Sequence, residues 1–228
     1  MYCDTSKVII NRVTKSTPGI NAIVTKKHYA QKWTASQYIF GLYWDMGESQ
    51  FFEDKDLKLI GVILYGHPVG RRAVKSIVDT FDTHNVLELK RLWIEDGYGK
   101  NIESYVISQS IKILKTLAPT VKVLISYADP SANHKGIIYR ATNWLYQGRE
   151  VGFGDCYKYR FPGQTAWLSS RSMAERCGSA GLVEVKKTFP DIEYKVNLRK
   201  HRYLYFLCGK KEKKELIKNL KHPLLKYD

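Results

Sequence analysis

The stretch ISYADPSANHKGIIYRATNWLYQG, residues 125–148, gathers side chains that can donate, accept and stack. An apolar run ends there at Asp129 and Pro130, and ligands of open sheets bind at the carboxyl ends of strands. A carboxylate at that place can orient an amine or accept its proton, and the phenol of Tyr139 can protonate a leaving group. Asp129 can equally cap the turn before a proline, and we read His134 as a loop residue. The pair Asp129 and Tyr139 is the first candidate for acid–base chemistry.

A second group of residues follows a β-rich run in RLWIEDGYGKNIES, residues 91–104. Two glycines separate a predicted strand from a predicted helix, and such a turn can leave backbone N–H groups free to bind an anion. The other reading is a tight turn that needs the conformational freedom of glycine. Asn101 is expected to cap the helix, with a serine of the first turn facing the same opening. The candidate donor-binding residues are Gly97, Gly99, Lys100, Asn101 and Ser104.

The elements that would hold these residues follow from hydrophobic periodicity and turn signals. Strands are expected at 6–13, 37–45, 57–66, 86–95, 121–127, 156–161 and 201–208, and helices at 25–33, 102–118, 135–148 and 172–178, with a basic helix near the C-terminus. Thr25 is expected to open the first helix. Strands come first, then strand–helix–strand–helix, then strands again. This order predicts an α/β (α+β) fold in which helices flank a mixed sheet.

The helix expected at 135–148 has two distinct stripes. The apolar stripe, predicted to face the core, consists of Ile137, Ile138, Ala141, Trp144 and Leu145. Tyr139, Asn143 and Tyr146 then share another stripe at i, i+4 and i+7. With Arg140, these side chains are candidates for stacking on a base or binding nucleic acid.

Composition favours an anionic partner. The 228 residues include 37 Lys and Arg against 22 Asp and Glu, for a net charge of +15, and 16 Tyr and five Trp. Cations interleaved with aromatic rings suit nucleic acid better than a membrane. Residues 199–228 carry ten Lys and Arg against three acids, a net +7, and their candidate phosphate ligands are Arg199, Lys200 and Arg202.

Other function classes are disfavoured. The four cysteines are not at Cys-x-x-Cys spacing, so reduced thiols are expected rather than a zinc ribbon or a disulfide framework. No apolar run is long enough to cross a bilayer, and the first residues do not resemble a secretory signal. We therefore expect a cytoplasmic protein with no membrane partner. The oligomeric state stays open.

The order strand, glycine loop, helix, strand and Tyr-bearing helix resembles the GNAT acyltransferase superfamily. The resemblance implies a mostly antiparallel central sheet flanked by helices, a loop that holds the phosphates of the donor, and a tyrosine that protonates the leaving group. GNAT proteins usually have Gln or Arg three residues before the first glycine of that loop. Ile94 takes this place here, which puts coenzyme A in doubt as the donor.

A narrower resemblance is to the phage Mom family, which has a GNAT-like core. It rests on YADPSANHKGIIYRATNWLYQG with ELKRLWI and NIES upstream, KHY at 27–29 and KHRYLYFL at 200–207, and it covers about residues 20–210. We therefore expect one GNAT-like domain over residues 1–228, with a core at about 20–165 that residues 166–228 complete. The family places a carbamoylmethyl group on the exocyclic amine of adenine in phage DNA, which blocks host restriction. Its functional residues would correspond here to His28, Tyr29, Arg91, Ser104, Asp129 and Tyr139.

The resemblance suggests a reaction, stated here as a hypothesis. The adenine would be flipped out of a duplex or presented single-stranded. The favoured donor is activated glycine, such as aminoacyl-tRNA, which makes tRNA a possible partner; acetyl-CoA is the alternative donor. A metal held by His28, Tyr29 and Asp129 stays open, since no His-x-His or Cys pair supports one. The competing readings are an ordinary acetyltransferase that uses acetyl-CoA and a nucleic-acid-binding module without catalysis.

Overall fold

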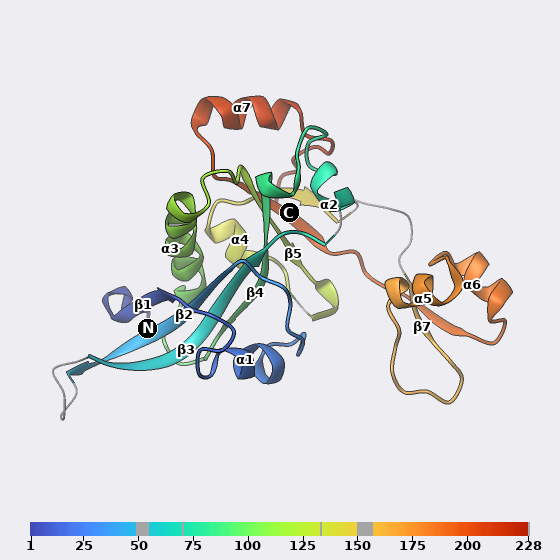
Figure 1. Cartoon of the computed structure of the whole chain (residues 1–228), viewed down its shortest axis with the longest axis horizontal. Coiled ribbons are helices and arrows are strands. Elements are labelled where there is room, and N and C mark those ends of the chain that lie inside the picture. The colour runs from blue at the N-terminus through green and yellow to red at the C-terminus, as the bar shows by residue number, and fades with distance from the viewer. Residues whose placement is uncertain (49–54, 70, 133, 150–156, 228) are drawn as a thin grey trace. The chain divides into compact units, whose positions relative to one another are not determined.

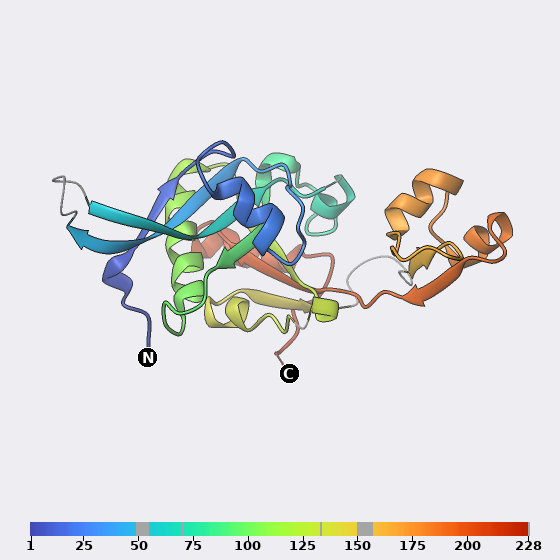
Figure 2. The ribbon, with the colours of Figure 1, turned by 90° about the horizontal axis from the view of Figure 1, so that it is seen from below.

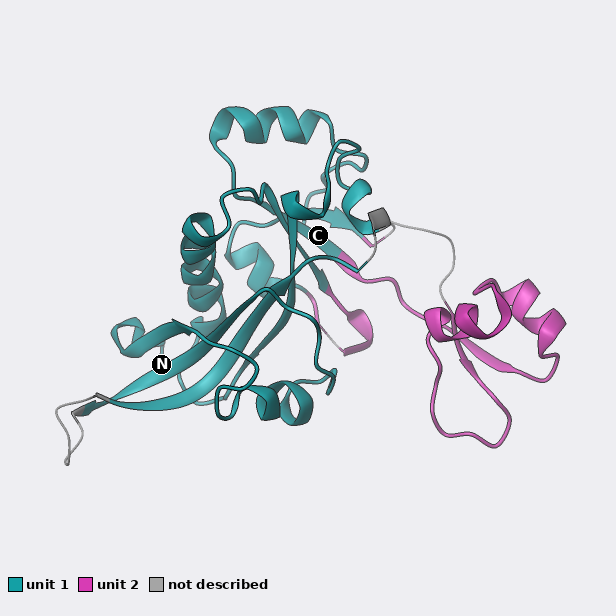
Figure 3. Ribbon diagram, viewed as in Figure 1, with its two compact units in different colours: residues 1–127, 136–148, 202–228 teal, residues 128–135, 149–201 magenta. Residues whose placement is uncertain are grey.

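The computed structural model describes residues 1–48, 55–69, 71–132, 134–149 and 157–227. These form two compact units (Figure 3). Unit 1 comprises residues 1–127, 136–148 and 202–228, and unit 2 comprises residues 128–135 and 149–201. The sequence predicted that residues 166–228 complete a single domain. Residues 202–228 belong to unit 1 and residues 166–201 to unit 2. The single domain with a core at about 20–165 stays a prediction.

Unit 1 is built on a seven-stranded sheet with the order β1-β2-β3-β4-β5-β9-β6 (Figure 1). Every strand pair whose register is described is antiparallel except β4–β5, which is parallel. Its strands are β1 (Val8–Arg12), β2 (Tyr38–Glu48), β3 (Lys55–Gly66), β4 (Val86–Ile94), β5 (Val123–Ala128), β6 (Leu145–Gly148) and β9 (His201–Phe206). Its α-helices are α1 (Ile20–Ala22), α2 (Arg71–Lys75), α3 (Ile102–Leu117), α4 (Ile137–Ala141) and α7 (Lys210–Lys218). Short turns η1 (Thr5–Lys7), π-helical η2 (Ile23–Lys27) and η3 (Thr83–Asn85) complete it. The fold is therefore the mixed, mostly antiparallel α/β architecture that the sequence predicts.

Both faces of the sheet are buried, as side-chain alternation along β3 shows. Val62 and Leu64 pack with Ile20 and Val24 of α1 and η2. Tyr65 points the other way, and its hydroxyl lies 2.7 Å from Ser110 Oγ on α3. Another apolar cluster joins the start of β4 and β5 to β9, and α7 packs on it through Leu216, Ile217 and Leu220. Helices thus cover the sheet from both sides.

Two irregularities in β4 shape the centre of the sheet. Leu64 pairs with Arg91 and Tyr65 with Leu89, so Lys90 is an extra residue in the ladder. Such a bulge reverses the alternation of side chains beyond it. The parallel pairing of β4 with β5 is described only from Val86 to Glu88. Beyond Glu88, side chains rather than the ladder connect the two strands.

Unit 2 has a small core of its own. Its β7 (Tyr157–Arg160) pairs with β8 (Glu193–Val196) in an antiparallel ribbon, and the helices α5 (Ser170–Cys177) and α6 (Leu182–Thr188) lie on one side of that ribbon (Figure 2). The core consists of Tyr159, Met173, Val185 and Ile192. The turn η4 (Pro130–Ala132) belongs to the same unit.

One predicted helix is wrong in its second half. The segment expected to be helical at 135–148 forms α4 and then β6, which pairs with β9. Thr142 and Asn143 end the helix: the Thr142 hydroxyl donates to the Ile138 carbonyl, and Asn143 adopts a left-handed φ of 60°. Of the apolar stripe, Trp144 is buried as predicted, whereas Ile137 is 70% exposed.

Other expectations had mixed outcomes. The helix expected at 102–118 is confirmed as α3 and buries Ile102, Val106 and Leu114. The helix expected at 25–33 is wrong, because α1 and η2 begin earlier and end at Lys27; Thr25 lies inside the turn and bonds back to the Asn21 carbonyl. The helix α6 and strand β8 had no counterpart in the prediction. Among the described residues, no helix is long and apolar enough to cross a membrane.

Candidate active site

The hydroxyl of Tyr139 lies where β4 and β5 stop pairing. Its Oη is 2.7 Å from Ser126 Oγ, and Ser126 Oγ is 3.1 Å from the Leu89 carbonyl oxygen. Ser126 has one hydroxyl proton, so it can donate to only one of the two oxygens, Tyr139 Oη or the Leu89 carbonyl, at a time. When it donates to Leu89, Tyr139 donates to Ser126; when it donates to Tyr139, the phenol proton is free for a third group. This switchable pair suits a proton donor.

Burial keeps Tyr139 protonated. The side chain is 6% exposed, and desolvation raises its pKa to about 12, against the opposing effect of the Ser126 hydrogen bond. A phenol with that pKa is neutral at physiological pH and can act as an acid but not as a base. The role of Tyr139 as a proton donor stays a prediction.

An aromatic stack fixes the orientation of Tyr139. Its ring lies 4.8 Å from that of Tyr203 on β9, and Tyr203 also contacts Tyr146 and Tyr227. The turn before α4 allows this packing because Gly136 has a φ of +71° and no side chain. A Cβ at Gly136 would lie 2.1 Å from the Tyr203 hydroxyl oxygen. Glycine is needed here for both backbone conformation and space.

Glu88 is a candidate that the sequence analysis missed. It is the last β4 residue with a described partner in β5, opposite Ile125, and its charge contributes to the raised pKa of both Tyr139 and Tyr127. A half-buried carboxylate so close to a protonated phenol can accept the proton that a nucleophilic amine must lose. The available signal was a charged residue between two leucines in the middle of a β-rich run.

His28 and Tyr29 follow η2 directly. The His28 ring is buried, its Nδ1 accepts the Ala30 N–H at 3.1 Å, and its centroid is 4.4 Å from that of Tyr29. Because Nδ1 is an acceptor, the neutral ring carries its proton on Nε2. Tyr29 is 54% exposed and contributes to the raised pKa of Tyr139. The structure thus brings Tyr29 into the electrostatic environment of Tyr139.

Arg91 ties the segment after His28 to the sheet. Its Nη1 donates to the Lys90 carbonyl at 2.6 Å and its Nη2 to the Lys32 carbonyl at 3.3 Å. Lys90 binds the Ala35 carbonyl at 3.0 Å, so both basic residues at the bulge hold this segment. The buried Arg91 Nε has no hydrogen-bond partner among the described residues. A buried donor of this kind is costly unless a ligand pairs with it.

Asp129 belongs to unit 2, where it caps a turn and forms an ion pair. Its Oδ1 accepts the Ser131 hydroxyl at 2.5 Å and the Ser131 N–H at 3.0 Å, and its Oδ2 lies 3.2 Å from Lys200 Nζ. Burial tends to raise the pKa of Asp129, but the hydrogen bonds from Ser131 and the charge of Lys200 outweigh it and lower the pKa. The residue is an ionised acceptor. Its convergence with Tyr139, which lies in unit 1, stays a prediction.

The glycine loop between β4 and α3 is partly filled by the N-terminal segment. Gly97 and Gly99 have φ values of +100° and +94°. The Lys100 N–H donates to the Met1 carbonyl at 3.0 Å, and its carbonyl accepts the Cys3 N–H at 3.1 Å. At least one amide expected to face donor phosphates is therefore occupied.

The start of α3 differs in detail from the expectation. Asn101 has a left-handed φ of 70° and makes no side-chain cap, whereas Ser104 Oγ donates to its carbonyl. A hollow of about 370 Å³ adjoins this point. Its lining includes Lys100, Asn101 and Ser104 with Tyr2 and Cys3.

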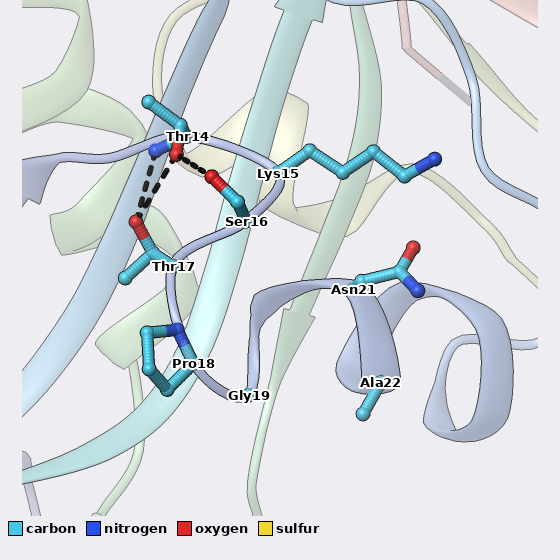
Figure 4. Close-up of a pocket in the computed structure, with 8 residues that line it drawn as sticks. All are labelled: Thr14, Lys15, Ser16, Thr17, Pro18, Gly19, Asn21 and Ala22. Atoms are coloured by element: carbon cyan, nitrogen blue, oxygen red, sulfur yellow. Dashed lines mark hydrogen bonds between the residues drawn. The ribbon is translucent and has the colours of Figure 1, made fainter.

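A larger hollow of about 680 Å³ lies elsewhere in unit 1, around Thr14–Ala22 (Figure 4). The hydroxyls of Thr14, Ser16 and Thr17 bond to one another, and the Lys15 ammonium lies over the Trp33 ring. None of the predicted site residues lines it. We assign this hollow no part in the reaction.

The residues expected to bind nucleic acid are dispersed. Arg140 and Asn143 are exposed around the end of α4, and Arg140 lies 5.4 Å over the Tyr227 ring. Tyr146 and Arg202 are buried in unit 1, and the Arg202 Nε and Nη2 have no partner among the described residues. Arg199 and Lys200 belong to unit 2. The structure thus does not gather these six residues on one described surface.

The described residues contain no cluster of metal-ligating side chains. In the part of the chain that is described, no three His, Cys, Asp or Glu side chains converge as ligands would. Cys3, Cys177 and Cys208 are free thiols, and Cys156 lies outside the described residues.

Comparison with known proteins places this geometry in context. The computed structure is similar to an Arabidopsis thaliana NAA60 solved with acetyl-CoA, with a TM-score of 0.50 and 10% identity over 89% of this chain and 99% of that one. A GNAT family acetyltransferase from Elizabethkingia anophelis, solved with acetyl-CoA bound, gives a TM-score of 0.46 and 10% identity, covering 89% of this chain and 99% of that chain. The fold is that of the GNAT acetyltransferases.

Sequence comparison is more specific. The chain is 26% identical over 194 residues to the methylcarbamoylase Mom of Escherichia phage Mu, covering 85% of this chain and 73% of the relative. The model of the Mom protein family matches residues 7–227, which include every predicted site residue. The chain therefore belongs to the Mom protein family.

Proposed function

We propose that this protein is a transferase that modifies adenine in DNA, adding a carbamoylmethyl group at the exocyclic amine and so protecting phage DNA from host restriction. The proposal is supported by membership of the Mom family and by a phage relative named a methylcarbamoylase. The observation that carries it is the neutral, buried phenol of Tyr139 beside Ser126, where β4 and β5 part. The reaction would take place in the host cytoplasm.

The chemistry requires a base and an acid. The exocyclic amine of adenine attacks the carbonyl carbon of an activated acyl group, Glu88 or Asp129 accepts the proton that the amine loses, and Tyr139 protonates the departing group. Arg91 positions the segment that carries His28 and Tyr29 through the Lys32 carbonyl. In this scheme one residue removes a proton from the amine, and another delivers a proton to the departing group.

The favoured donor is glycine activated as an ester, such as aminoacyl-tRNA. Attack by the adenine amine forms an N-glycyl adenine and releases the ester alcohol. The free amine of the glycyl group then attacks carbon six of the purine, and the original nitrogen leaves that carbon as the amide of the product. Every atom of the carbamoylmethyl group then comes from glycine and the original amine, with no oxidant or reductant. The occupied Lys100 amide and Ile94 at the loop support a donor without coenzyme A.

Acetyl transfer from acetyl-CoA is the second candidate. It is favoured by the similarity to the Arabidopsis protein solved with acetyl-CoA. The hollow beside Ser104 and Lys100 would then receive part of the donor. This reaction would leave an acetyl group, not a carbamoylmethyl group, on the acceptor amine.

Nucleoside analysis tests the proposal. The chain would be expressed in bacteria, and their DNA digested and analysed by mass spectrometry. We expect a modified deoxyadenosine with the mass of a carbamoylmethyl group. Acetyl-deoxyadenosine would support the second candidate, and unmodified DNA from cells that contain folded protein would exclude both reactions on DNA.

A further inference from the structure

The ribbon of unit 2 has one face that its own helices do not cover. Along β7, Tyr157 and Tyr159 point toward α5 and α6, so Lys158 and Arg160 point to the opposite side. Lys195 on β8 pairs with Lys158 and therefore shares that side. Trp167 joins them, because its neighbour Leu168 pairs with Tyr159 and faces the core. Glu193 on β8 pairs with Arg160 and lies on that side too. We call this surface the ribbon face; it consists of Lys158, Arg160, Trp167, Glu193 and Lys195.

The ribbon face places two lysines directly opposite each other. Lys158 and Lys195 are cross-strand partners, and like charges in this arrangement destabilise a sheet. No carboxylate among the described residues forms an ion pair with either lysine. Arg160, in contrast, pairs with Glu193 through Nε at 2.8 Å and through Nη2. Repulsion between the two ammonium groups destabilises the ribbon. A bound anion would remove that repulsion.

Trp167 holds two of these cations in place. The Lys195 ammonium lies 4.2 Å and the Arg160 guanidinium 4.7 Å from its ring centroid. Each contact is electrostatically favourable. It also restricts a long side chain that would otherwise lose entropy when it binds a ligand. The cations are thus oriented in advance, and the ring offers an edge on which a base or sugar can pack.

The chain reaches unit 2 by leaving the sheet of unit 1. β6 and β9 pair directly with each other, so residues 149–201 are inserted between two neighbouring strands. The described part of that insertion, 157–201, has nine Lys and Arg against four Asp and Glu. The insertion has its own apolar core and does not interrupt the pairing of β6 with β9. It carries more positive than negative charge.

We propose that the ribbon face binds the phosphate backbone of the DNA whose adenine is modified. This inference rests on the proposed function for the identity of the polymer. Lys158 and Lys195 bind neighbouring phosphates, Trp167 holds Lys195 in position, and the charge of Arg160 is matched by Glu193. Contacts of this kind are independent of sequence and weaken with salt.

The decisive variant is Lys195→Glu, because it separates a structural from a binding role. It replaces a like-charge pair with an opposite-charge pair across the ribbon, which offsets the lost contact of Lys195 with Trp167, so the protein should be about as stable as wild type. Its affinity for a fluorescent DNA duplex should nevertheless fall about ten-fold at physiological salt, with the salt slope reduced by about one. Arg171→Glu is the matched control, since it makes the same change of charge on the exposed side of α5. This control should bind DNA like wild type.

Two results would overturn the proposal. They are unchanged duplex binding by Lys195→Glu and equal weakening of duplex binding by Arg171→Glu. The proposed function is judged separately, by modified adenine in cells that express the wild-type chain. If that adenine is absent while Lys195→Glu still weakens duplex binding, the ribbon face stands as a DNA-binding surface and the proposed reaction fails.

Discussion

Tyr139 Oη and Ser126 Oγ lie 2.7 Å apart in the centre of unit 1. Ser126 follows the last β5 residue with a described partner in β4, so its hydroxyl lies where a backbone ladder would otherwise continue. A second buried pair, Tyr65 and Ser110, has the same separation but joins β3 to α3, and Tyr65 pairs with Leu89 close enough to the parting for Tyr139 to contribute to its raised pKa. The Tyr65–Ser110 pair therefore serves as a control for the loss of a buried tyrosine–serine hydrogen bond.

Replacing Ser126 tests whether its hydroxyl assists proton delivery. Ser126→Ala leaves the buried phenol without its partner, so we expect a loss of about 1–3 kcal/mol in unfolding free energy and about a ten-fold lower rate of adenine modification. Chemical denaturation and nucleoside mass spectrometry measure the two effects. Ser110→Ala should lose similar stability and keep its modification rate. Equal rates for both variants would remove Ser126 from the mechanism.

Glu88→Gln tests the base that the structure suggests. Removing the carboxylate while keeping its shape should lower the modification rate by about 10²-fold without weakening DNA binding. Glu103→Gln, in the first turn of α3, is the matched control and should modify adenine normally. If Glu88→Gln is as active as wild type while Asp129→Asn is not, proton removal belongs to Asp129.

Gly136 should tolerate no side chain. Gly136→Ala combines a left-handed backbone with a Cβ that would overlap the Tyr203 ring, so it should lose more than about 2 kcal/mol of unfolding free energy. Gly97 has a φ of +100° with open space around its Cβ position, so Gly97→Ala should lose only about 1–2 kcal/mol. Thermal unfolding of both variants separates the cost of overlap from the cost of backbone strain. Equal losses would mean that the Tyr203 contact is unimportant.

The hydrogen bonds from Ser131 and the ion pair with Lys200 make the contribution of Asp129 to stability depend on pH. Its folded pKa is lower than the ordinary value of 3.8, so the carboxylate contributes stability that is complete above the unfolded pKa and is lost as pH falls through the folded pKa. The stability difference between wild type and Asp129→Asn should therefore shrink as pH is lowered through the carboxyl range. Urea denaturation at a series of pH values measures it. Lys200→Ala should weaken this dependence, and a difference that is constant with pH would show that the ion pair is absent in solution.

The sequence predicted most of unit 1 because its signals are local. The 3.6-residue period of α3 and the β-rich composition of β2 and β3 do not depend on distant residues. The motif containing Asp129 and Tyr139 predicts a site at both residues, and their joint role stays a prediction. β6 was missed because its only signal is its pairing with β9, which follows an insertion of more than fifty residues. The predicted amphipathic stripe therefore continued past Thr142 and Asn143, where the helix ends in the structure.

The chemistry was predicted less completely than the fold. Glu88 looks like an ordinary alternating residue of a strand, and only the parting of β4 and β5 beside it gives it a role. Arg202, expected to bind phosphate, is 2% exposed because it lies in β9, opposite Gly148. The ribbon face depends on the pairing of Lys158 with Lys195, and β8 was not predicted at all. Long-range strand pairing decided each of these cases.

Tyr139→Phe tests the central claim most directly, because it removes one oxygen atom and leaves the aromatic stack. Bacteria would express wild type, Tyr139→Phe or the matched control Tyr65→Phe at equal levels, and carbamoylmethyl-deoxyadenosine in their DNA would be measured by mass spectrometry. We expect the modified nucleoside with wild type and Tyr65→Phe, and at least about 10²-fold less with Tyr139→Phe. Equal amounts with Tyr139→Phe and wild type would contradict the account.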